Sequence, residues 1–250
     1  MREFGHAPRE HGLFLGAFQR EEEIMMLVIP DVLTQAEVAE ARELLEQANW
    51  HSGRETAGYI AVTQKSNEQL HVHDEVAVKL GQLILRALSS NQLFISFVLP
   101  LKIFSPMFNR YRGGGEYGFH IDNAIRVDPL SGQRIRTDVS TTVFLSNPED
   151  YVGGELVIND TYGVESLKLP AGHAVAYPST SLHRVNPVTQ GQRTASFFWA
   201  QSMVPDDARR AILFDLDNSI QRLATRQENV DEVTRLTGTY HNLVRQWAQA

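Results

Sequence analysis

Two side chains that suit a metal ion lie two residues apart in the sequence. His120 and Asp122 follow a run of three glycines, residues 113–115. Residues two apart in a β-strand point to the same face of a sheet, so this imidazole and carboxylate can reach one point. With a second histidine they would form a 2-His-1-carboxylate triad, which suits Fe(II) and leaves coordination positions open for oxygen chemistry. We expect His183 to be that second histidine.

Two helices are predicted ahead of this segment. Thr34 is followed three residues later by Glu37, which is the capping-box pattern, and apolar residues continue at helical spacing to about Ala48. Residues 74–88 form the second predicted helix, whereas residues 51–72 between the two are polar and rich in turn-forming residues. The apolar face of the second helix consists of Val76, Val78, Leu80, Leu83, Ile84 and Leu88.

Beyond Asn91 the sequence takes on the character of β-structure. Short apolar segments alternate with Gly, Pro, Asn and Asp, which is typical of strands joined by turns. Many short strands favour a sandwich or barrel over β–α–β units. The predicted fold is therefore mainly β with flanking helices (α+β), around a jelly-roll core. The predicted strands are residues 94–104, 108–111, 140–145, 155–158, 173–177 and 194–199.

The chain is expected to divide into three segments. Residues 1–24 are charged and lack apolar periodicity, so we expect an extension or tag outside the core. Residues 25–204 would hold the N-terminal helices and the jelly roll. Residues 205–250 would form two helices, 206–225 and 228–249, packed on that core. Their apolar residues at helical spacing are expected to form a packing or dimer surface; they are Leu213, Leu216, Ile220 and Leu223.

The composition argues against several classes of protein. The chain has 250 residues, a net charge of −7 and no basic cluster, which disfavours a nucleic-acid-binding surface. No apolar run approaches the roughly 18–20 residues of a membrane span. The absence of cysteine excludes disulfides, thiolate catalysis and cysteine-ligated zinc. Because the N-terminus lacks the pattern of a signal peptide, we expect a cytoplasmic location.

The order of His120-x-Asp122, His183 and Arg193 resembles the Fe(II)/2-oxoglutarate-dependent dioxygenases of the prolyl/lysyl-hydroxylase type. The bacterial PKHD-type hydroxylases of the PiuC/YbiX group are the most similar. The resemblance extends from about Met25 to the C-terminus. Its fold, a double-stranded β-helix, agrees with the predicted strands. The segments that carry the resemblance are residues 111–123, residues 141–156 with a Gly-Gly-Glu-Leu turn at 153–156, and residues 169–199.

This resemblance implies a dioxygenase that uses O2 to hydroxylate an unactivated C–H bond and converts 2-oxoglutarate to succinate and CO2. Fe(2+) would be held by His120, Asp122 and His183. Arg193 would bind the far carboxylate of 2-oxoglutarate, Tyr111 would add a phenol contact, and L-ascorbate would act as reductant. Related halogenases lack the carboxylate that Asp122 supplies, so its presence implies hydroxylation.

The substrate is left open by the sequence. The resemblance implies a peptidyl proline or lysine, or a small molecule linked to iron or siderophore uptake, and neither nucleic acid nor membrane is expected as a partner. A homodimer through the helical regions is a further expectation. The alternative function is a non-catalytic, cupin-like protein that senses a small carboxylate or oxygen through the metal. Arg193 beside a complete triad favours the enzyme, because a bare metal sensor does not need it.

Other histidines compete for the third metal position. The motif His71-x-His73 has the same spacing as His120-x-Asp122, but it directly precedes a predicted helix, where capping is expected. His173 follows a Pro-Ala-Gly turn, and its distance from Arg193 does not fit the family's pattern. The ten residues from His183 to Arg193 are expected to make one turn and return on the adjacent strand.

Other polar residues near the motif also have simpler interpretations. Arg184 directly follows His183 and should point to the opposite face of its strand, in a structural or substrate-side role. The three glycines at 113–115 lack the Lys-Ser/Thr and helix of a phosphate-binding loop, so a flexible turn is expected. Tyr111 and Tyr117 are equally compatible with core packing.

Overall fold

The computed structural model describes residues 26–56, 65–160, 163–226 and 230–249. The predicted extension at 1–24 lies outside the described residues. The helices are α1 (Gln35–Gln47), α2 (Glu75–Ser89), α3 (Gln92–Val98), α4 (Asp207–Ala224) and α5 (Val230–Trp247), with 3-10 turns η1 (Gly53–Thr56) and η3 (Pro148–Asp150).

The strands are short, apart from the last. In chain order they are β1 (Leu27–Ile29), β2 (His51–Ser52), β3 (Lys65–Ser66), β4 (Glu68–Gln69), β5 (Pro100–Ile103), β6 (Met107–Arg112), β7 (Gly115–His120), β8 (Ile125–Val127), β9 (Arg134–Arg136), β10 (Val139–Phe144), β11 (Tyr151–Gly153), β12 (Leu156–Asp160), β13 (Gly163–Leu167), β14 (Ala174–Pro178) and β15 (Leu182–Ser202).

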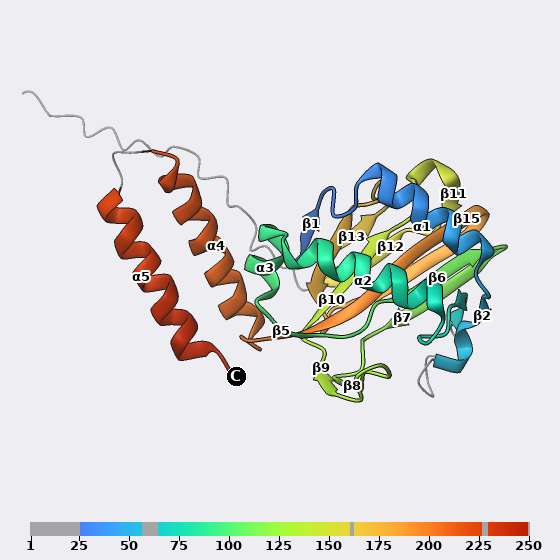
Figure 1. The fold of residues 1–250 in the computed structure, drawn as a ribbon, viewed down its shortest axis with the longest axis horizontal. Helices are drawn as coiled ribbons and strands as arrows, with labels where there is room; N and C mark the ends of the chain where they lie inside the picture. Colours follow the sequence, from blue (N-terminus) through green and yellow to red (C-terminus); the bar gives the residue numbers. More distant parts are fainter. Residues whose placement is uncertain (1–25, 57–64, 161–162, 227–229, 250) are drawn as a thin grey trace, which may run out of the picture.

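Two antiparallel sheets share strand β15 (Figure 1). The larger sheet has the order β1-β14-β10-β15-β6-β4-β2, and β5 also pairs with β15. In the smaller sheet β12 pairs with both β13 and β15, β7 pairs with β15 and β3, and β11 pairs with β15. Side chains from both sheets pack in one apolar cluster, including Phe144 and Val175 from the larger sheet and Leu156 and Val185 from the smaller. The predicted jelly-roll core with flanking helices is confirmed.

The two-residue alternation of a strand separates the two faces of the larger sheet. On β10, Val139 and Val143 pack in the cluster that includes helices α1, α2 and α3. Phe144, on the opposite face of the same strand, packs in the cluster between the two sheets. One face of the larger sheet is therefore covered by helices (Figure 1), and the other face lines the interior between the two sheets.

Strand β15 passes from one sheet to the other through a bend at Gly191. Its first half pairs with β7 and β12, and its second half pairs with β10 and β6. Gly191 has a φ of +71°, and a Cβ there would lie 2.0 Å from the backbone oxygen of Asp150. Only glycine fits this bend, because other residues rarely adopt this positive φ and an added Cβ would clash with the backbone of Asp150.

Gly191→Ala should therefore destabilise the fold by at least about 2 kcal/mol, which for a chain of this size lowers the melting temperature by roughly 4–8 °C. Gly238→Ala is the matched control, since Gly238 lies in α5 with nothing within 4 Å of the added Cβ. That change should stabilise the helix by about 0.5–1 kcal/mol. Equal melting temperatures for the two variants, measured by calorimetry, would contradict the role given to the bend.

The two predicted N-terminal helices are confirmed, with their caps. The Thr34 hydroxyl accepts from the Glu37 amide, and the Glu37 carboxylate accepts from the Thr34 amide at 2.8 Å. Asp74 caps α2 by accepting from the Val76 amide at 2.8 Å. The polar segment 51–72 was expected to be turn-rich, and its described part also contributes the short strands β2, β3 and β4.

The prediction of a strand over residues 94–104 is wrong for its first half. Helix α3 occupies Gln92–Val98, and only Pro100–Ile103 forms a strand. The Asn91 side chain accepts from the Phe94 amide at 3.0 Å and starts the helix, and Leu99, with a φ of 46°, ends it. A short run that is apolar on every side has no period to distinguish a buried helix from a buried strand.

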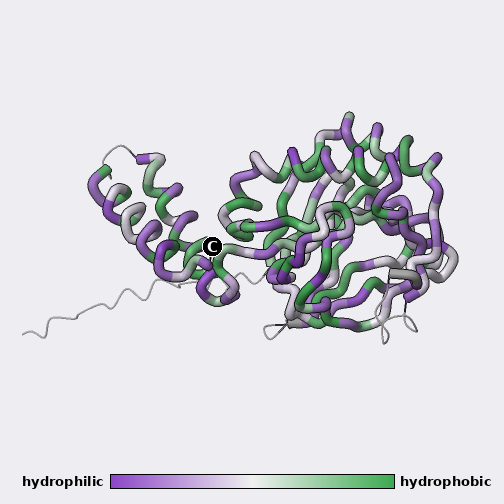
Figure 2. The backbone as a smooth tube through the Cα atoms, turned by 60° about the horizontal axis from the view of Figure 1, so that its bottom comes forward, coloured by the Kyte–Doolittle hydropathy of each residue, from purple (hydrophilic) through white to green (hydrophobic). Residues whose placement is uncertain are grey.

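The two C-terminal helices stand beside the jelly roll (Figures 1 and 2). Phe214 of α4 packs edge-on against Phe97 of α3, with ring centroids 5.3 Å apart. In its described part α5 has no buried residue, and it packs on α4 through half-buried side chains such as Leu243 and Trp247. Among the described residues, no helix is both long enough and apolar enough to cross a bilayer.

Candidate metal centre

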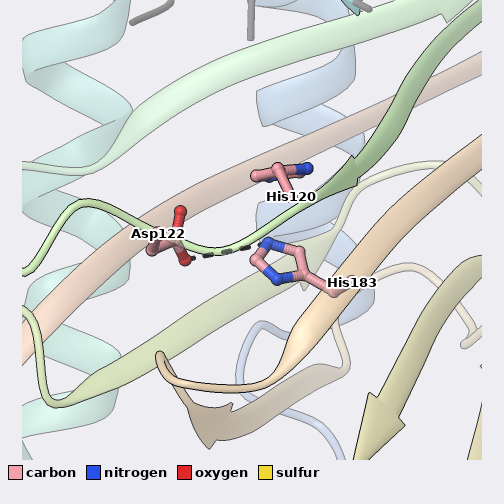
Figure 3. Close-up of side chains that lie close together, drawn as sticks. All are labelled: His120, Asp122 and His183. Atoms are coloured by element: carbon pink, nitrogen blue, oxygen red, sulfur yellow. Dashed lines mark ion pairs between the residues drawn. The ribbon is translucent and has the colours of Figure 1, made fainter. Parts of the chain in front are cut away.

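Three potential metal ligands meet where β7 and β15 run side by side. His120 is the last residue of β7, Asp122 lies in the loop just after it, and His183 lies near the start of β15. His120 and His183 are direct partners in the strand register. One ligand atom from each of the three residues lies within 4.8 Å of the others (Figure 3). The arrangement is a facial triad of the type that suits Fe(II).

Both imidazole rings are held by the backbone. Nδ1 of His120 lies 2.8 Å from the Gly118 carbonyl oxygen, and Nδ1 of His183 lies 3.0 Å from that of Ser181. In the tautomer that carries its proton on Nδ1, each ring donates to a carbonyl and keeps the Nε2 lone pair for a metal. Nε2 of His183 is 3.7 Å from Oδ2 of Asp122, a separation that a shared ion can bridge.

The carboxylate of Asp122 is oriented by two serines. The Ser140 hydroxyl donates to Oδ2 of Asp122 at 2.6 Å and lies 2.7 Å from the Ser179 hydroxyl. Ser140 is on β10 and Ser179 directly follows β14, so the larger sheet orients a ligand that belongs to the loop after β7. Nothing in the sequence marked either serine.

Burial keeps the site in the protonation state that metal binding requires. Desolvation first, and then the neighbouring His183, lower the pKa of His120 to about 4, so its ring is neutral at pH 7. Tyr117 stacks on this ring with centroids 3.6 Å apart, and burial raises the pKa of Tyr117 to about 12. A neutral imidazole under a neutral phenol ring is ready to donate its lone pair.

The triad opens into a cavity of about 490 Å³ between the two sheets. Tyr111 and Tyr177 line this cavity, and burial raises the pKa of both phenols, so both remain neutral hydrogen-bonding groups. Arg193 also lines it. The cavity therefore combines the triad with phenol and guanidinium groups, which is enough to bind a metal together with a small anion.

Arg193 is a buried cation that needs an anion. Its side chain is 1% exposed, and its guanidinium carbon lies 5.5 Å and 5.2 Å from the ring centroids of Tyr111 and Phe144. Within the described part of the chain no carboxylate lies within 4.0 Å of Arg193, and its buried Nε has no hydrogen-bond partner. Burying a charge without a partner is costly, so a carboxylate ligand is the expected occupant.

The competing residues lie elsewhere. Nδ1 of His173 is 3.9 Å from Oδ1 of Asp31 and the residue does not line the cavity. The motif at His71 precedes the Asp74 cap of α2, as expected. The Arg184 guanidinium lies over Phe119, 4.5 Å from the ring centroid, on the opposite face from His183. None of the three joins the described triad.

Two geometric expectations are wrong. His120 and Asp122 do not share a strand, because β7 ends at His120 and Asp122 reaches the site from the loop that follows. His183 and Arg193 are not on adjacent strands either, since both belong to β15. The bend at Gly191 carries the strand into the other sheet, so the two side chains still face one cavity.

Sequence reasoning missed several residues that line the cavity. They are Lys65, Asn67, Asn109, Arg126 and Tyr177. They come from β3, β6, β8, β14 and the residue between β3 and β4, and no local pattern in the sequence connects them. Strand pairing brings most of these residues to one place, and Arg126 reaches it by packing of the separate β8-β9 ribbon.

Comparison with known protein families gives two matches. The 2OG-Fe(II) oxygenase superfamily matches residues 106–201, and the PKHD-type hydroxylase C-terminal domain matches residues 207–249. A PKHD-type hydroxylase of Caulobacter vibrioides is 55% identical over 226 residues, which cover 90% of this chain and 100% of the relative. PKHD-type hydroxylase PiuC of Pseudomonas aeruginosa is 52% identical over 225 residues, with 90% and 100% coverage.

A solved structure supports the fold. The prolyl hydroxylase of Trichoplax adhaerens, in complex with a hypoxia inducible factor oxygen degradation domain peptide fragment, matches with a TM-score of 0.51 and 18% identity. The match covers 76% of this chain and 86% of that one. At this identity the likeness concerns the fold alone.

Proposed function

Because the chain belongs to the PKHD-type hydroxylases of the 2OG-Fe(II) oxygenase superfamily, and is thus an Fe(II)/2-oxoglutarate-dependent hydroxylase, we propose specific roles for its residues. His120, Asp122 and His183 hold the iron. Arg193 binds the far carboxylate of 2-oxoglutarate, and Tyr111 adds a hydroxyl contact. The observation that carries this assignment is the buried, unpaired Arg193 in the same cavity as the triad, within the described chain.

The residues that line the cavity fit both Fe(II) and 2-oxoglutarate. Two neutral imidazoles and one carboxylate suit ferrous iron, which when bound supplies oxygen activation coupled to decarboxylation of 2-oxoglutarate. Arg193 offers a planar fork of donors that matches a carboxylate and cannot lose its charge. The apolar walls around it, including Phe144 and Leu156, exclude water and strengthen that pair.

The substrate class and reductant are further parts of the proposal. An unactivated C–H bond of a peptide or a small molecule is hydroxylated, and L-ascorbate restores the ferrous state after turnover without substrate. The prolyl hydroxylase of Trichoplax adhaerens was solved in complex with a peptide fragment. A homodimer through α4 and α5 and a cytoplasmic location stay predictions.

Succinate release tests the proposal directly. Protein with Fe(II), ascorbate and 2-oxoglutarate in air should form succinate slowly without substrate, and addition of cell extract should produce molecules heavier by one oxygen. Omitting ascorbate should shorten the period of activity. Binding of 2-oxoglutarate with no succinate under any condition would favour the cupin-like sensor instead.

Ser140→Ala should weaken Fe(II) binding by about 10- to 100-fold, because Asp122 would lose the hydroxyl that orients it. Anaerobic titration with Fe(II) measures this. Ser196→Ala is the control, since Ser196 is also buried on the same sheet but donates to the Met107 carbonyl and does not line the cavity. Unchanged Fe(II) affinity in the Ser140 variant, or equal losses in both, would contradict the role of Ser140.

A further inference from the structure

The cavity carries more positive charge than iron and 2-oxoglutarate explain. Its described lining includes three cations, Lys65, Arg126 and Arg193, and a single carboxylate, that of Asp122. With both groups bound, the charges of Fe(II), the 2-oxoglutarate dianion, Asp122 and Arg193 cancel. Arg126 then remains as a cation that none of these charges balances, in a partly enclosed site whose lining also includes Lys65. Such a site attracts an anion and repels a cation.

Arg126 is held in place by aromatic rings. It lies on β8, in the two-stranded ribbon formed with β9. Its guanidinium carbon is 4.2 Å from the ring centroid of Trp199 and 5.7 Å from that of Phe104. Stacking fixes the plane of a guanidinium while its edge keeps the N–H donors for a planar oxyanion.

The donors of Arg126 lack a partner within the described residues. Its Nε is buried and makes no hydrogen bond, and no carboxylate lies within 4.0 Å of the group. Other arginines of this protein do have a carboxylate partner, as Arg110 has Glu68 and Arg136 has Asp138. A buried donor without an acceptor costs free energy, and a bound oxyanion would remove that cost.

Lys65 brings a second cation to the same cavity. Burial, followed by repulsion from Arg126, lowers the pKa of Lys65 to about 8. An anion between the two groups would relieve that repulsion.

Part of the cavity lining is apolar and exposed to solvent. Phe119 and Ile121 line the cavity and are 40% and 58% exposed, on either side of the ligand His120. A ligand that contacts this part of the lining beside the metal site is expected to have an apolar portion. A cavity of about 490 Å³, shared with 2-oxoglutarate, is in the range of small-molecule sites.

We propose that the substrate hydroxylated here is a small organic acid. Its carboxylate binds Arg126, with Lys65 as the second cation, and its apolar portion lies against Phe119 and Ile121 beside the metal. Arg126 is thus a specificity-determining residue. The inference rests on the proposed function, because it assumes that Arg193 is occupied by 2-oxoglutarate.

A pair of probes that differ only in charge tests this. Hexanoate and hexanamide are titrated into anaerobic protein that holds Fe(II) and saturating 2-oxoglutarate. Paramagnetic broadening of the probe's proton resonances reports binding close to the iron. Hexanoate should bind at least about 30-fold more tightly than hexanamide, the order expected for a buried, hydrogen-bonded charge pair. Equal affinities would overturn the proposal.

Variants of Arg126 test whether this residue causes the preference for hexanoate over hexanamide. Arg126→Gln should remove it and leave hexanamide binding within about twofold, and Arg126→Lys should recover part of it because the charge remains without the fork. Arg134→Gln is the matched control, with the same charge change at an exposed position on the neighbouring strand β9. A preference for hexanoate that survives in Arg126→Gln would reject the assignment. If that variant does not fold, Arg126→Lys and Lys65→Gln decide, and an unchanged preference in both would reject it.

Two further readouts separate the possible failures. The charge-transfer absorbance of the Fe(II)–2-oxoglutarate complex should persist in every variant of Arg126. Its absence from the unmodified protein would refute the proposed function, whereas its presence without a preference for hexanoate would refute only the acid substrate. If an acetylated, amidated Gly-Glu-Gly peptide binds more tightly than hexanoate in the same broadening experiment, the choice of a small molecule is overturned.

Discussion

Arg193→Ala should raise the concentration of 2-oxoglutarate required for binding by roughly two to four orders of magnitude, because breaking a buried charge pair costs about 3–5 kcal/mol. The guanidinium is almost fully buried and lies close to the rings of Tyr111 and Phe144, so alanine would leave the buried carboxylate without this charged partner. Titration of 2-oxoglutarate into the anaerobic Fe(II) protein, followed by charge-transfer absorbance, measures the change. Fe(II) binding should remain nearly intact, since Arg193 contacts none of the three ligands.

Two variants sharpen this test. Arg193→Lys should recover only part of the affinity, because an ammonium group lacks the fork that matches a carboxylate. Arg184→Ala removes an arginine from the same strand that points away from the cavity, so 2-oxoglutarate affinity should not change. Unchanged affinity in Arg193→Ala would reject the assignment and direct attention to Tyr111.

His183→Ala should abolish turnover and reduce Fe(II) affinity by more than about 100-fold, the upper end of the loss seen for residues that only orient a ligand. Removing this ring leaves two of the three ligands. It also leaves the carboxylate of Asp122 facing a gap in a site that is largely closed to water. Succinate formation and anaerobic Fe(II) titration measure the two effects.

His173→Ala is the matched control for this prediction. The side chain of His173 lies near Asp31, outside the cavity, so both Fe(II) affinity and succinate formation should be retained. If the His173 variant loses iron and the His183 variant keeps it, the third ligand has been assigned to the wrong histidine.

Local signals in the sequence were sufficient for α1 and α2. Thr34 with Glu37, and Asp74 ahead of an apolar face, are caps whose partners lie within three residues, so their physics is complete in a short segment. The strand prediction for 94–98 was wrong because a short apolar run has no period that separates a buried helix from a buried strand. Whether this apolar run becomes α3 depends on the Asn91 cap and on the surface that buries Phe94 and Phe97.

The residue types and their order determined the chemistry by themselves. A histidine and a carboxylate two residues apart, a distal histidine and an arginine ten residues beyond it define a set of groups that suits Fe(II) and an anionic cosubstrate. That set also matches a known family, which the comparisons establish. This inference needs no interatomic distances, because the ligand that a side chain prefers is a property of that side chain.

Only the tertiary structure decided how these groups meet and what else meets them. Asp122 is oriented by Ser140 on another strand, and Arg193 enters the cavity because β15 bends at Gly191 into the second sheet. Arg126 reaches the same cavity from a separate ribbon and stacks on Trp199. Such contacts arise from strand pairing and side-chain packing between residues far apart in the chain, and side chains brought together in this way leave no period or spacing in the sequence.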